Sequence, residues 1–325
     1  MTSVLLTGAN GFIGRYVSDA ARQRGFQVAT MGRRPDPGIA VVHELCKPIE
    51  HISVPDWVFH LAGGYAGANL RELQSHDVVM ARNLLGWGGA NRVRNWVFAS
   101  AAEVYGAVTG LASEDTATRP VIPYGAVKLE VEHLFADFAA RLPDSRVVVL
   151  RIGEVYGANG RLVQELQARF RRSFCPWLGN GMVPLSFVHV KDVAQAFINA
   201  ADSAQIGFSI YNIADDEPTT WRGFLQFMST LLGARGPVFL PLPLARVYAT
   251  ASFLLAKASG ASPIVTHNIV RLLTTPKKIS NVKAKSNLGL NLRYRNYRTG
   301  LTEILSTGGT HTEDYIGIPH HAQNG

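Results

Sequence analysis

The sequence predicts an α/β protein with a doubly wound parallel sheet and a smaller C-terminal lobe. In the first half of the chain, short apolar runs alternate with segments of helical periodicity, as in strand–helix–strand units. The apolar runs hold almost no polar residues, which is typical of strands covered on both faces. A glycine-rich turn joins the first apolar run to the first helical segment.

The expected elements follow one another regularly as far as Arg151. Strands are expected at residues 4–7, 27–31, 57–62, 95–100 and 146–151, and helices at 13–24, 75–89 and 124–141. Beyond Arg151, loops rich in Gly and Pro interrupt the alternation. There we expect a strand at 208–213 and helices at 192–201, 221–232 and 243–258.

The turn over residues 7–14 reads T-G-A-N-G-F-I-G and has the spacing of a phosphate-binding loop. Gly8 permits a tight turn, Gly11 lets the backbone approach a pyrophosphate, and Gly14 lets the helix pack on the sheet. The helix N-terminus offers unpaired N–H groups and a positive dipole end to the phosphates. The context of strand, turn and helix therefore predicts a dinucleotide site made by Gly8, Asn10, Gly11, Phe12, Ile13 and Gly14.

The end of the second strand indicates which dinucleotide is bound. Sites specific for NAD usually place there an acid that binds the ribose 2′-hydroxyl, whereas this chain has Gly32 followed by Arg33 and Arg34. A guanidinium matches a 2′-phosphate, and the missing carboxylate removes the repulsion that would reject it. The sequence predicts NADP(H), with Arg33 as the main phosphate ligand and Arg34 assisting.

Tyr124 and Lys128 form a Y-x-x-x-K pair about 110 residues after the glycine turn. At helical spacing i and i+4 they share one face of a helix. The ammonium group and the charge of the nicotinamide are expected to lower the pKa of the phenol. Tyr124 is then a usable acid or base for a carbonyl or alcohol oxygen during hydride transfer.

Taken with further segments, these motifs resemble the extended short-chain dehydrogenase/reductase family, which includes NAD-dependent epimerases and dehydratases. The resemblance runs from about Ser3 to Leu305, and its carriers are residues 7–14, 56–63, 96–106, 124–128, 151–157, 187–193 and 211–214. It implies a Rossmann sheet, a C-terminal substrate lobe and often a homodimer. It also implies that Lys128 holds the nicotinamide ribose, and that Leu61, Ala62 and Gly63 line the cofactor.

These implications give an expected domain organisation. An NADP(H)-binding Rossmann domain is expected over residues 1–165, and residues 186–215 return to it. A substrate-binding lobe is expected over residues 166–308, followed by a flexible polar tail over residues 309–325.

The chain departs from the family pattern next to the expected catalytic tyrosine. Ala101 stands where the family usually has Ser or Thr, and a methyl group cannot hydrogen-bond the reacting oxygen. Ser100 lies one residue earlier, so on a regular strand its hydroxyl points to the opposite face unless a kink brings it in. Glu103 falls where similar sugar dehydratases carry a catalytic glutamate. An acid/base role and a purely local hydrogen-bonding role for Glu103 both remain open.

A second departure concerns the substrate. Sugar-nucleotide enzymes of the family usually have Arg at the position of Leu185, and losing it removes a charge-assisted contact worth roughly 1.5–3 kcal/mol. The stretch 240–264 is largely apolar, as in branches that act on hydroxysteroids and alkyl ketones. We expect an NADP(H)-dependent oxidoreductase with a small, weakly charged carbonyl or secondary alcohol substrate. A nucleotide-sugar epimerase, dehydratase or 4-ketoreductase, and an NADP-binding redox sensor with little catalysis, remain open.

Three further titratable residues have either a structural or a functional interpretation. His60 and His189 lie in apolar strand contexts and are expected to be structural. Glu154 follows a strand end, where other family members place a substrate-contacting residue.

Composition and charge limit the remaining possibilities. The net charge is +8, with the basic residues spread along the chain, so no nucleic-acid partner is expected. Cys46 and Cys175 are far apart and fit neither a disulfide framework nor a metal motif, which suits the cytoplasm. The first six residues lack a basic region followed by an apolar run, so they are expected to form a strand and not a signal peptide. Residues 240–258 are too short, and too interrupted by Arg246 and Lys257, to span a bilayer.

Overall fold

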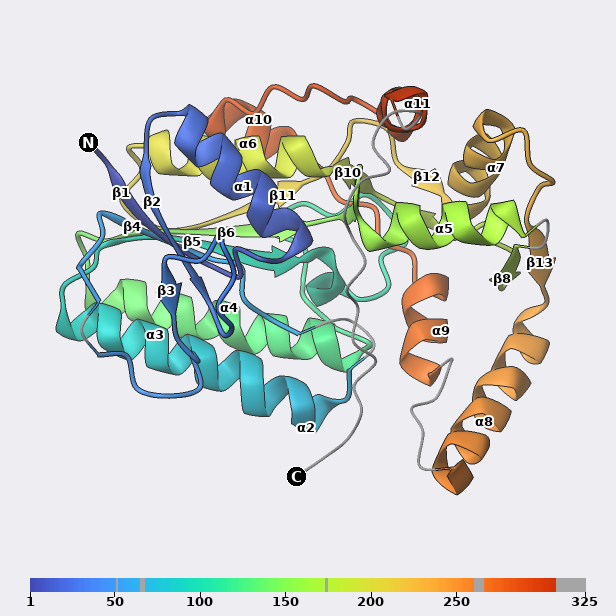
Figure 1. Cartoon of the computed structure of the whole chain (residues 1–325), viewed down its shortest axis with the longest axis horizontal. Helices are drawn as coiled ribbons and strands as arrows, with labels where there is room; N and C mark the ends of the chain where they lie inside the picture. Colours follow the sequence, from blue (N-terminus) through green and yellow to red (C-terminus); the bar gives the residue numbers. More distant parts are fainter. Residues whose placement is uncertain (51, 65–67, 173–174, 260–265, 308–325) are drawn as a thin grey trace.

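The computed structural model of the chain describes residues 1–50, 52–64, 68–172, 175–259 and 266–307. At its centre lies a seven-stranded parallel sheet with the order β11-β6-β5-β4-β1-β2-β3 (Figure 1). The strands are β1 (Ser3–Thr7), β2 (Gln27–Gly32), β3 (Val41–Val42), β4 (Trp57–His60), β5 (Asn95–Ala101), β6 (Arg146–Ile152) and β11 (Gly207–Ile213). The chain progresses outward from β1 to β3 and then in the other direction from β4. The predicted doubly wound fold is thereby confirmed, and its ligand crevice is expected at this reversal.

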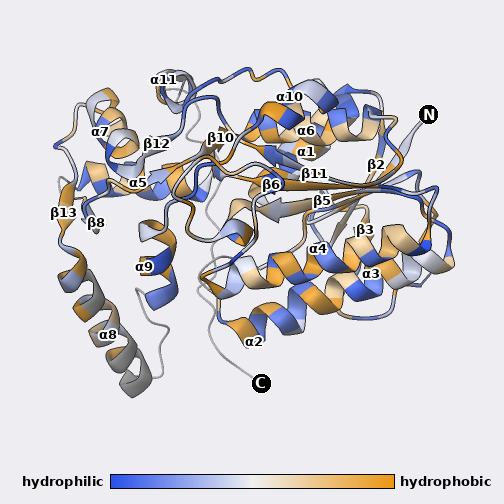
Figure 2. Ribbon diagram, turned by 180° about the vertical axis from the view of Figure 1, so that it is seen from behind, coloured by the Kyte–Doolittle hydropathy of each residue, from blue (hydrophilic) through white to orange (hydrophobic). Residues whose placement is uncertain are grey.

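Two layers of helices cover the sheet. On one face lie α1 (Phe12–Gln23), α6 (Val190–Asp202) and α10 (Val282–Leu288); on the other lie α2 (Leu70–Leu73), α3 (Val79–Ala90) and α4 (Pro123–Arg141) (Figure 1). Hydrophobic and hydrophilic bands alternate along α3 and α4 (Figure 2). Successive strand residues serve opposite faces, since Leu6 packs with Phe59 and Phe197, whereas Leu5 packs with residues of the α3–α4 side.

The second half of the chain adds a lobe beyond the carboxyl edge of the sheet. Its elements are β7 (Glu154–Tyr156), α5 (Arg161–Arg171), β8 (Pro176–Leu178), β9 (Pro184–Leu185), β10 (Phe187–His189), β12 (Thr219–Thr220), α7 (Trp221–Leu231), β13 (Val238–Leu240), α8 (Leu242–Ser259), α9 (His267–Thr274) and α11 (Tyr297–Thr307). The core of the lobe is aromatic, because Phe187 stacks on Phe224 and packs edge-on against Trp221. Helix α8 projects away from the body beside α9 (Figure 1).

Several boundaries differ from the expectations. The helix expected at 75–89 begins at Leu70 and contains a π-helical stretch, η1 (Gln74–Val78). The short strands of the lobe and helices α5, α9, α10 and α11 had no counterpart in the expected elements. The expected tail at 309–325 lies outside the described residues. None of the helices in the described ranges is long and apolar enough to cross a membrane.

Candidate active site

The glycine turn after β1 has the close contacts that its sequence predicts. Gly8 has φ +72°, and a Cβ there would lie 2.7 Å from the backbone nitrogen of Ala62. A Cβ on Gly14 would lie 2.2 Å from the Gly8 carbonyl oxygen, which also accepts a hydrogen bond of 3.0 Å from the Gly11 N–H. The turn is therefore compact enough to leave the N-terminus of α1 open at the crevice.

The loop after β4 lies directly beside this turn. The Ala62 N–H donates to Thr7 Oγ1 at 3.3 Å, and the Leu61 N–H donates to the Thr7 carbonyl oxygen at 3.3 Å. Thr7 Oγ1 also lies 2.8 Å from His60 Nδ1. Burial lowers the pKa of His60 to about 3, so this imidazole is neutral and supports the loop from beneath.

The remaining cofactor candidates fall into two groups. Ile13 packs against the core on the α1–α6 side. The Phe12 ring lies against Gly160, where a Cβ would be only 2.6 Å from the ring. Asn10 lies near the end of β2, 3.7 Å from where a Cβ on Gly32 would be. Arg33 and Arg34 follow Gly32 as exposed side chains, at the same edge of the sheet.

Lys128 is placed between the expected cofactor loop and the expected catalytic tyrosine. Its Nζ donates to the Ala99 carbonyl oxygen at 3.2 Å and lies 5.6 Å from the centre of the Tyr124 ring. A Cβ on Gly63 would lie 3.0 Å from both Lys128 Nζ and Asp77 Oδ2. Burial lowers the pKa of Lys128, while the nearby carboxylates oppose that effect.

Asp77 is a site residue that the sequence did not reveal. It is 3% exposed, lies on the π-helical stretch η1, and accepts a hydrogen bond of 2.8 Å from the Gly64 N–H. Burial raises its pKa, whereas Lys128 lowers it. A π-helical stretch is a recurrent feature of functional sites. The sequence could not reveal this stretch, because its residue periodicity does not distinguish it from an ordinary helix.

Tyr124 lies in the first turn of α4, which packs tightly on the short helix η2 (Ala102–Tyr105). A Cβ on Gly125 would lie 2.4 Å from the Glu103 carbonyl oxygen. The expected lowering of the phenol pKa is wrong for this arrangement. Burial raises the pKa of Tyr124, and the carboxylates of Glu103, Asp77 and Glu154 raise it further. The phenol is therefore protonated at neutral pH.

A cluster of Glu103, Lys277 and Glu154 lies close enough to Tyr124 to affect its ionisation. Lys277 Nζ donates to Glu103 Oε1, and this pair is nearly buried. Burial raises the pKa of Glu154 to about 7; Glu103 adds to the shift and Lys277 opposes it. Among the described residues, no donor is hydrogen-bonded to the Glu154 carboxylate. One ammonium group thus serves two carboxyl groups.

Backbone pairing holds this cluster in place. The Lys277 N–H donates to the Pro184 carbonyl oxygen at 2.9 Å, and the Ser186 N–H donates to the Lys277 carbonyl oxygen at 3.0 Å. The Glu154 N–H in turn donates to the Ser186 carbonyl oxygen at 2.9 Å. Lys277 could not be predicted as a site residue, because it stands in a Lys-Lys pair with no motif around it.

The Ser100 side chain is hydrogen-bonded to a residue other than Tyr124. Its hydroxyl donates to Glu132 Oε1, and Glu132 pairs with Arg151 at 2.7 Å in the interior. The Arg151 guanidinium lies 4.8 Å from the centre of the Tyr105 ring. Ser100 therefore serves a buried ion pair beneath the site, and it does not compensate for the methyl group of Ala101.

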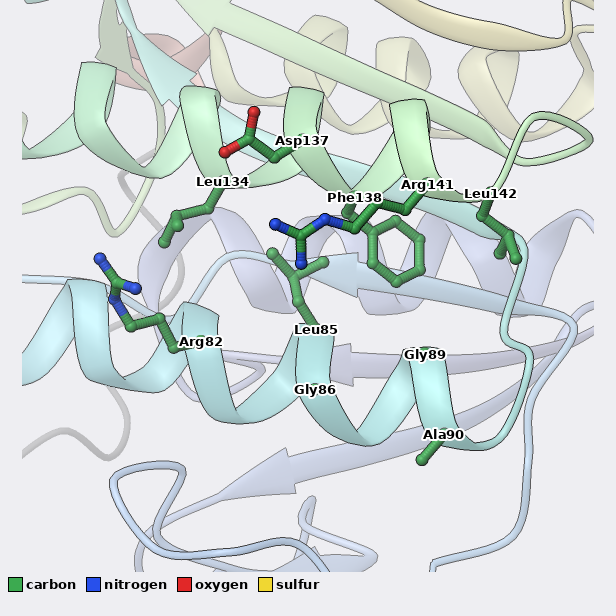
Figure 3. Close-up of a pocket in the computed structure, with 10 residues that line it drawn as sticks. All are labelled: Arg82, Leu85, Gly86, Gly89, Ala90, Leu134, Asp137, Phe138, Arg141 and Leu142. Carbon is green, nitrogen blue, oxygen red and sulfur yellow. The ribbon is translucent and has the colours of Figure 1, made fainter.

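A separate hollow of about 600 Å³ lies between α3 and α4 (Figure 3). Its lining includes Gly86 and Gly89 from α3 and Phe138 and Arg141 from α4. It adjoins the C-terminal half of α4, whereas Tyr124 lies in the first turn of that helix. The hollow is thus distinct from the candidate active site. In the described part of the chain, no group of His, Cys, Asp and Glu side chains is arranged to hold a metal ion.

Comparison with known proteins places this geometry in a family. The model of the NAD dependent epimerase/dehydratase family matches residues 4–214. The mouse epimerase family protein SDR39U1 is 28% identical over 252 residues, which cover 74% of this chain and 83% of the relative. The sterol-4-alpha-carboxylate 3-dehydrogenase, decarboxylating, of Dictyostelium discoideum is 22% identical over 330 residues, which cover 94% of this chain and all of the relative.

Solved structures agree on the fold. Human SDR39U1 with NADPH superposes with a TM-score of 0.76 at 21% identity, covering 94% of this chain and 99% of the other. MoeE5 in complex with UDP-glucuronic acid and NAD superposes with a TM-score of 0.75 at 25% identity, covering 94% of this chain and 98% of the other. The sheet order, the glycine turn and these matches lead to one conclusion: the chain belongs to the NAD dependent epimerase/dehydratase family.

Proposed function

We propose that the protein is an NADP(H)-dependent oxidoreductase that acts on the carbonyl or secondary alcohol of a small, weakly charged substrate. The observation that carries the proposal is the position of Lys128. Its Nζ lies against Gly63 of the cofactor loop and beside the Tyr124 ring, so the expected cofactor edge and the expected acid meet there. The same geometry disfavours an NADP-binding sensor without catalysis.

The residues present fit a dinucleotide, because a Cβ at Gly8 or Gly14 would fill the turn where phosphates are expected. Gly8, Gly11 and the open N-terminus of α1 would hold the diphosphate, and Lys128 would hold the nicotinamide ribose. When bound, the cofactor supplies or accepts the hydride at its nicotinamide ring.

Tyr124 handles the proton in this proposal. Because burial and three carboxylates keep the phenol protonated, it donates a proton to the carbonyl oxygen as that carbon is reduced, and it accepts one in the reverse direction. Ala101 offers no second donor, so Tyr124 carries the hydrogen bond to the reacting oxygen alone.

The preference for NADP(H) rests on Gly32, Arg33 and Arg34. Both arginines are exposed at the end of β2, and no carboxylate follows that strand directly. Titration with NADPH and NADH tests the preference. Arg33→Ala is expected to weaken NADPH binding by about tenfold or more and to leave NADH nearly unchanged. Arg22→Ala, an exposed arginine of α1, is the matched control. Equal affinity of the unaltered protein for the two cofactors would contradict the proposal.

The substrate preference rests on the charges around Tyr124. Leu185 supplies no cation for a diphosphate, and the nearby ammonium of Lys277 is already paired with Glu103. The competing function is a nucleotide-sugar epimerase, dehydratase or 4-ketoreductase, favoured by the likeness to MoeE5 with UDP-glucose or UDP-glucuronic acid. A thermal-shift comparison separates the two, because strong stabilisation by UDP or dTDP would favour the competing function.

We also propose a cytoplasmic homodimer. The two described cysteines are free thiols, which suits a reducing compartment. The hollow between α3 and α4 has charges of both signs in Arg82, Asp137 and Arg141, as a two-fold contact requires (Figure 3).

Substituting Gly86 tests the dimer. A Cβ on Gly86 would meet nothing within 4 Å, so Gly86→Arg is expected to fold normally and to convert dimer to monomer. Light scattering after size exclusion measures the mass. A monomeric unaltered protein, or a dimer that survives this substitution, would contradict the proposed interface.

A further inference from the structure

The excess of basic over acidic residues lies in one part of the chain, although Lys and Arg occur along its whole length. Residues 218–302 hold 12 Lys and Arg and no Asp or Glu. The rest of the chain holds 20 basic and 24 acidic residues and carries a charge of −4. The entire net positive charge therefore resides in one continuous part of the chain, residues 218–302. Such an asymmetry is typical of proteins that approach an anionic surface.

Part of this charge is neutralised by acids from outside the segment. Lys277 pairs with Glu103, Lys285 and Arg295 pair with Asp216, Arg293 pairs with Glu303, and Arg298 lies 3.7 Å from Glu217. Lys277 lies in the candidate active site, and Lys285 lies on α10 over the sheet. The exposed Arg271 of α9 has no acidic partner among the described residues. Positive charge is thus left over near α8 and α9.

Helix α8 presents an apolar stripe to the solvent beside this charge. Leu244, Val247, Tyr248 and Leu255 are 57%, 66%, 47% and 70% exposed. Their spacing of three, four and seven residues places them on one face of the helix. Ala249, from another face, and Ser252, at the edge of the exposed one, are buried, and α8 packs on α9. We call these four exposed side chains the α8 stripe.

We propose that the α8 stripe docks the protein on an anionic lipid surface, with the basic residues around α9 facing the headgroups. An apolar helix face that projects from the body suits insertion between headgroups, because it needs no matching groove (Figure 1). A segment of 85 residues without a single carboxylate removes the repulsion that such a surface would otherwise exert. The helix lies in the interface without crossing the bilayer.

Flotation of the full chain with lipid vesicles tests this proposal. Neutral phosphatidylcholine vesicles are compared with vesicles that contain about 30 mol% phosphatidylserine. The protein is expected to bind the anionic vesicles at least about tenfold more tightly and to lose that advantage at high salt. The doubly substituted Val247→Asp, Leu255→Asp protein and, separately, Arg271→Glu are each expected to lose about tenfold in affinity. A change of mid-point in thermal unfolding would reveal a folding defect instead.

Matched controls come from the other side of the molecule. Ile206→Asp alters a residue that is 64% exposed, and Arg22→Glu alters an exposed arginine of α1, so neither is expected to change vesicle binding. Equal binding to both vesicle types would overturn the proposal. Binding that depends on salt but survives the α8 double substitution would also overturn it. So would a change from dimer to monomer in the double variant, because the stripe would then cover a second copy of the chain.

Discussion

At Tyr124, burial and negative charge act in the same direction. The ammonium group of Lys128 was expected to lower the pKa of the Tyr124 phenol. Lys128 is itself buried, however, and its own pKa is lowered. Its ammonium group is engaged by the Ala99 carbonyl oxygen and lies close to Asp77. In the reaction proposed here, the phenol keeps its proton until a substrate oxygen develops negative charge and takes it.

Removing the phenol oxygen is the direct check of this role. Tyr124→Phe is expected to lower turnover of any ketone substrate by about 10²–10⁴-fold, because the proton donor is lost. NADPH affinity and thermal stability are expected to change little, since the ring and its packing remain. Steady-state kinetics with a cofactor titration measure both effects. Retention of more than about a tenth of the activity would assign the proton to another group.

Glu154 gives the site a characteristic pH dependence. Its pKa of about 7 in the folded protein lies above the ordinary value of 4.5, because burial penalises the carboxylate. Its contribution to stability is complete below pH 4.5 and is lost as the pH rises through about 7. Relative to Glu154→Gln, the unaltered protein is expected to lose up to about 3 kcal/mol of unfolding free energy over this range. Urea unfolding at several pH values measures the difference, and parallel curves for the two proteins would contradict it.

At the scale of elements, sequence patterns predicted the helices and strands that are long and have a regular apolar repeat. The strands around Leu5, Phe59 and Val148 and the helix beginning near Tyr124 were predicted within a few residues, because their apolar residues repeat over several turns or pleats. The two- and three-residue strands of the lobe could not be predicted. Pro184 and Leu185, for example, form a strand because Thr219 and Thr220 pair with them, and no local pattern encodes that pairing.

The ion pair of Glu132 and Arg151 ties α4 to β6 and receives the hydroxyl of Ser100 from β5. Both side chains are at most 5% exposed. Glu132→Ala is expected to lower the unfolding free energy by about 3–5 kcal/mol, because it strands a buried guanidinium. Glu165→Ala breaks an exposed pair with Arg161 on α5 and is expected to cost less than about 1 kcal/mol. Chemical denaturation compares them, and similar costs would show that burial of the first pair does not matter.

At the scale of the whole molecule, the sequence predicted the part of the candidate site whose residues form short sequence motifs. Gly8, Gly11 and Gly14 are close in sequence, and Tyr124 and Lys128 are one helical turn apart, so local geometry relates them. Lys277 reaches Glu103 only because the lobe returns to the sheet. The partner of Ser100 could not be predicted for the same reason, since Glu132 is placed by how α4 lies on β5.

The Lys277–Glu103 pair also has a consequence for the order in which the protein is made and folds. The pair joins residues 174 positions apart, and the 93-residue separation of Ser186 and Ile279 is closed in the same place. Contacts of such long range form after local ones, because a large loop must close before they yield any stabilisation. During synthesis, the glycine turn and the first strands can assemble as soon as they emerge from the ribosome. The cluster of charged side chains near Tyr124 is complete only when the segment after α9 has been translated. The cofactor side of the candidate site can therefore form before its substrate side.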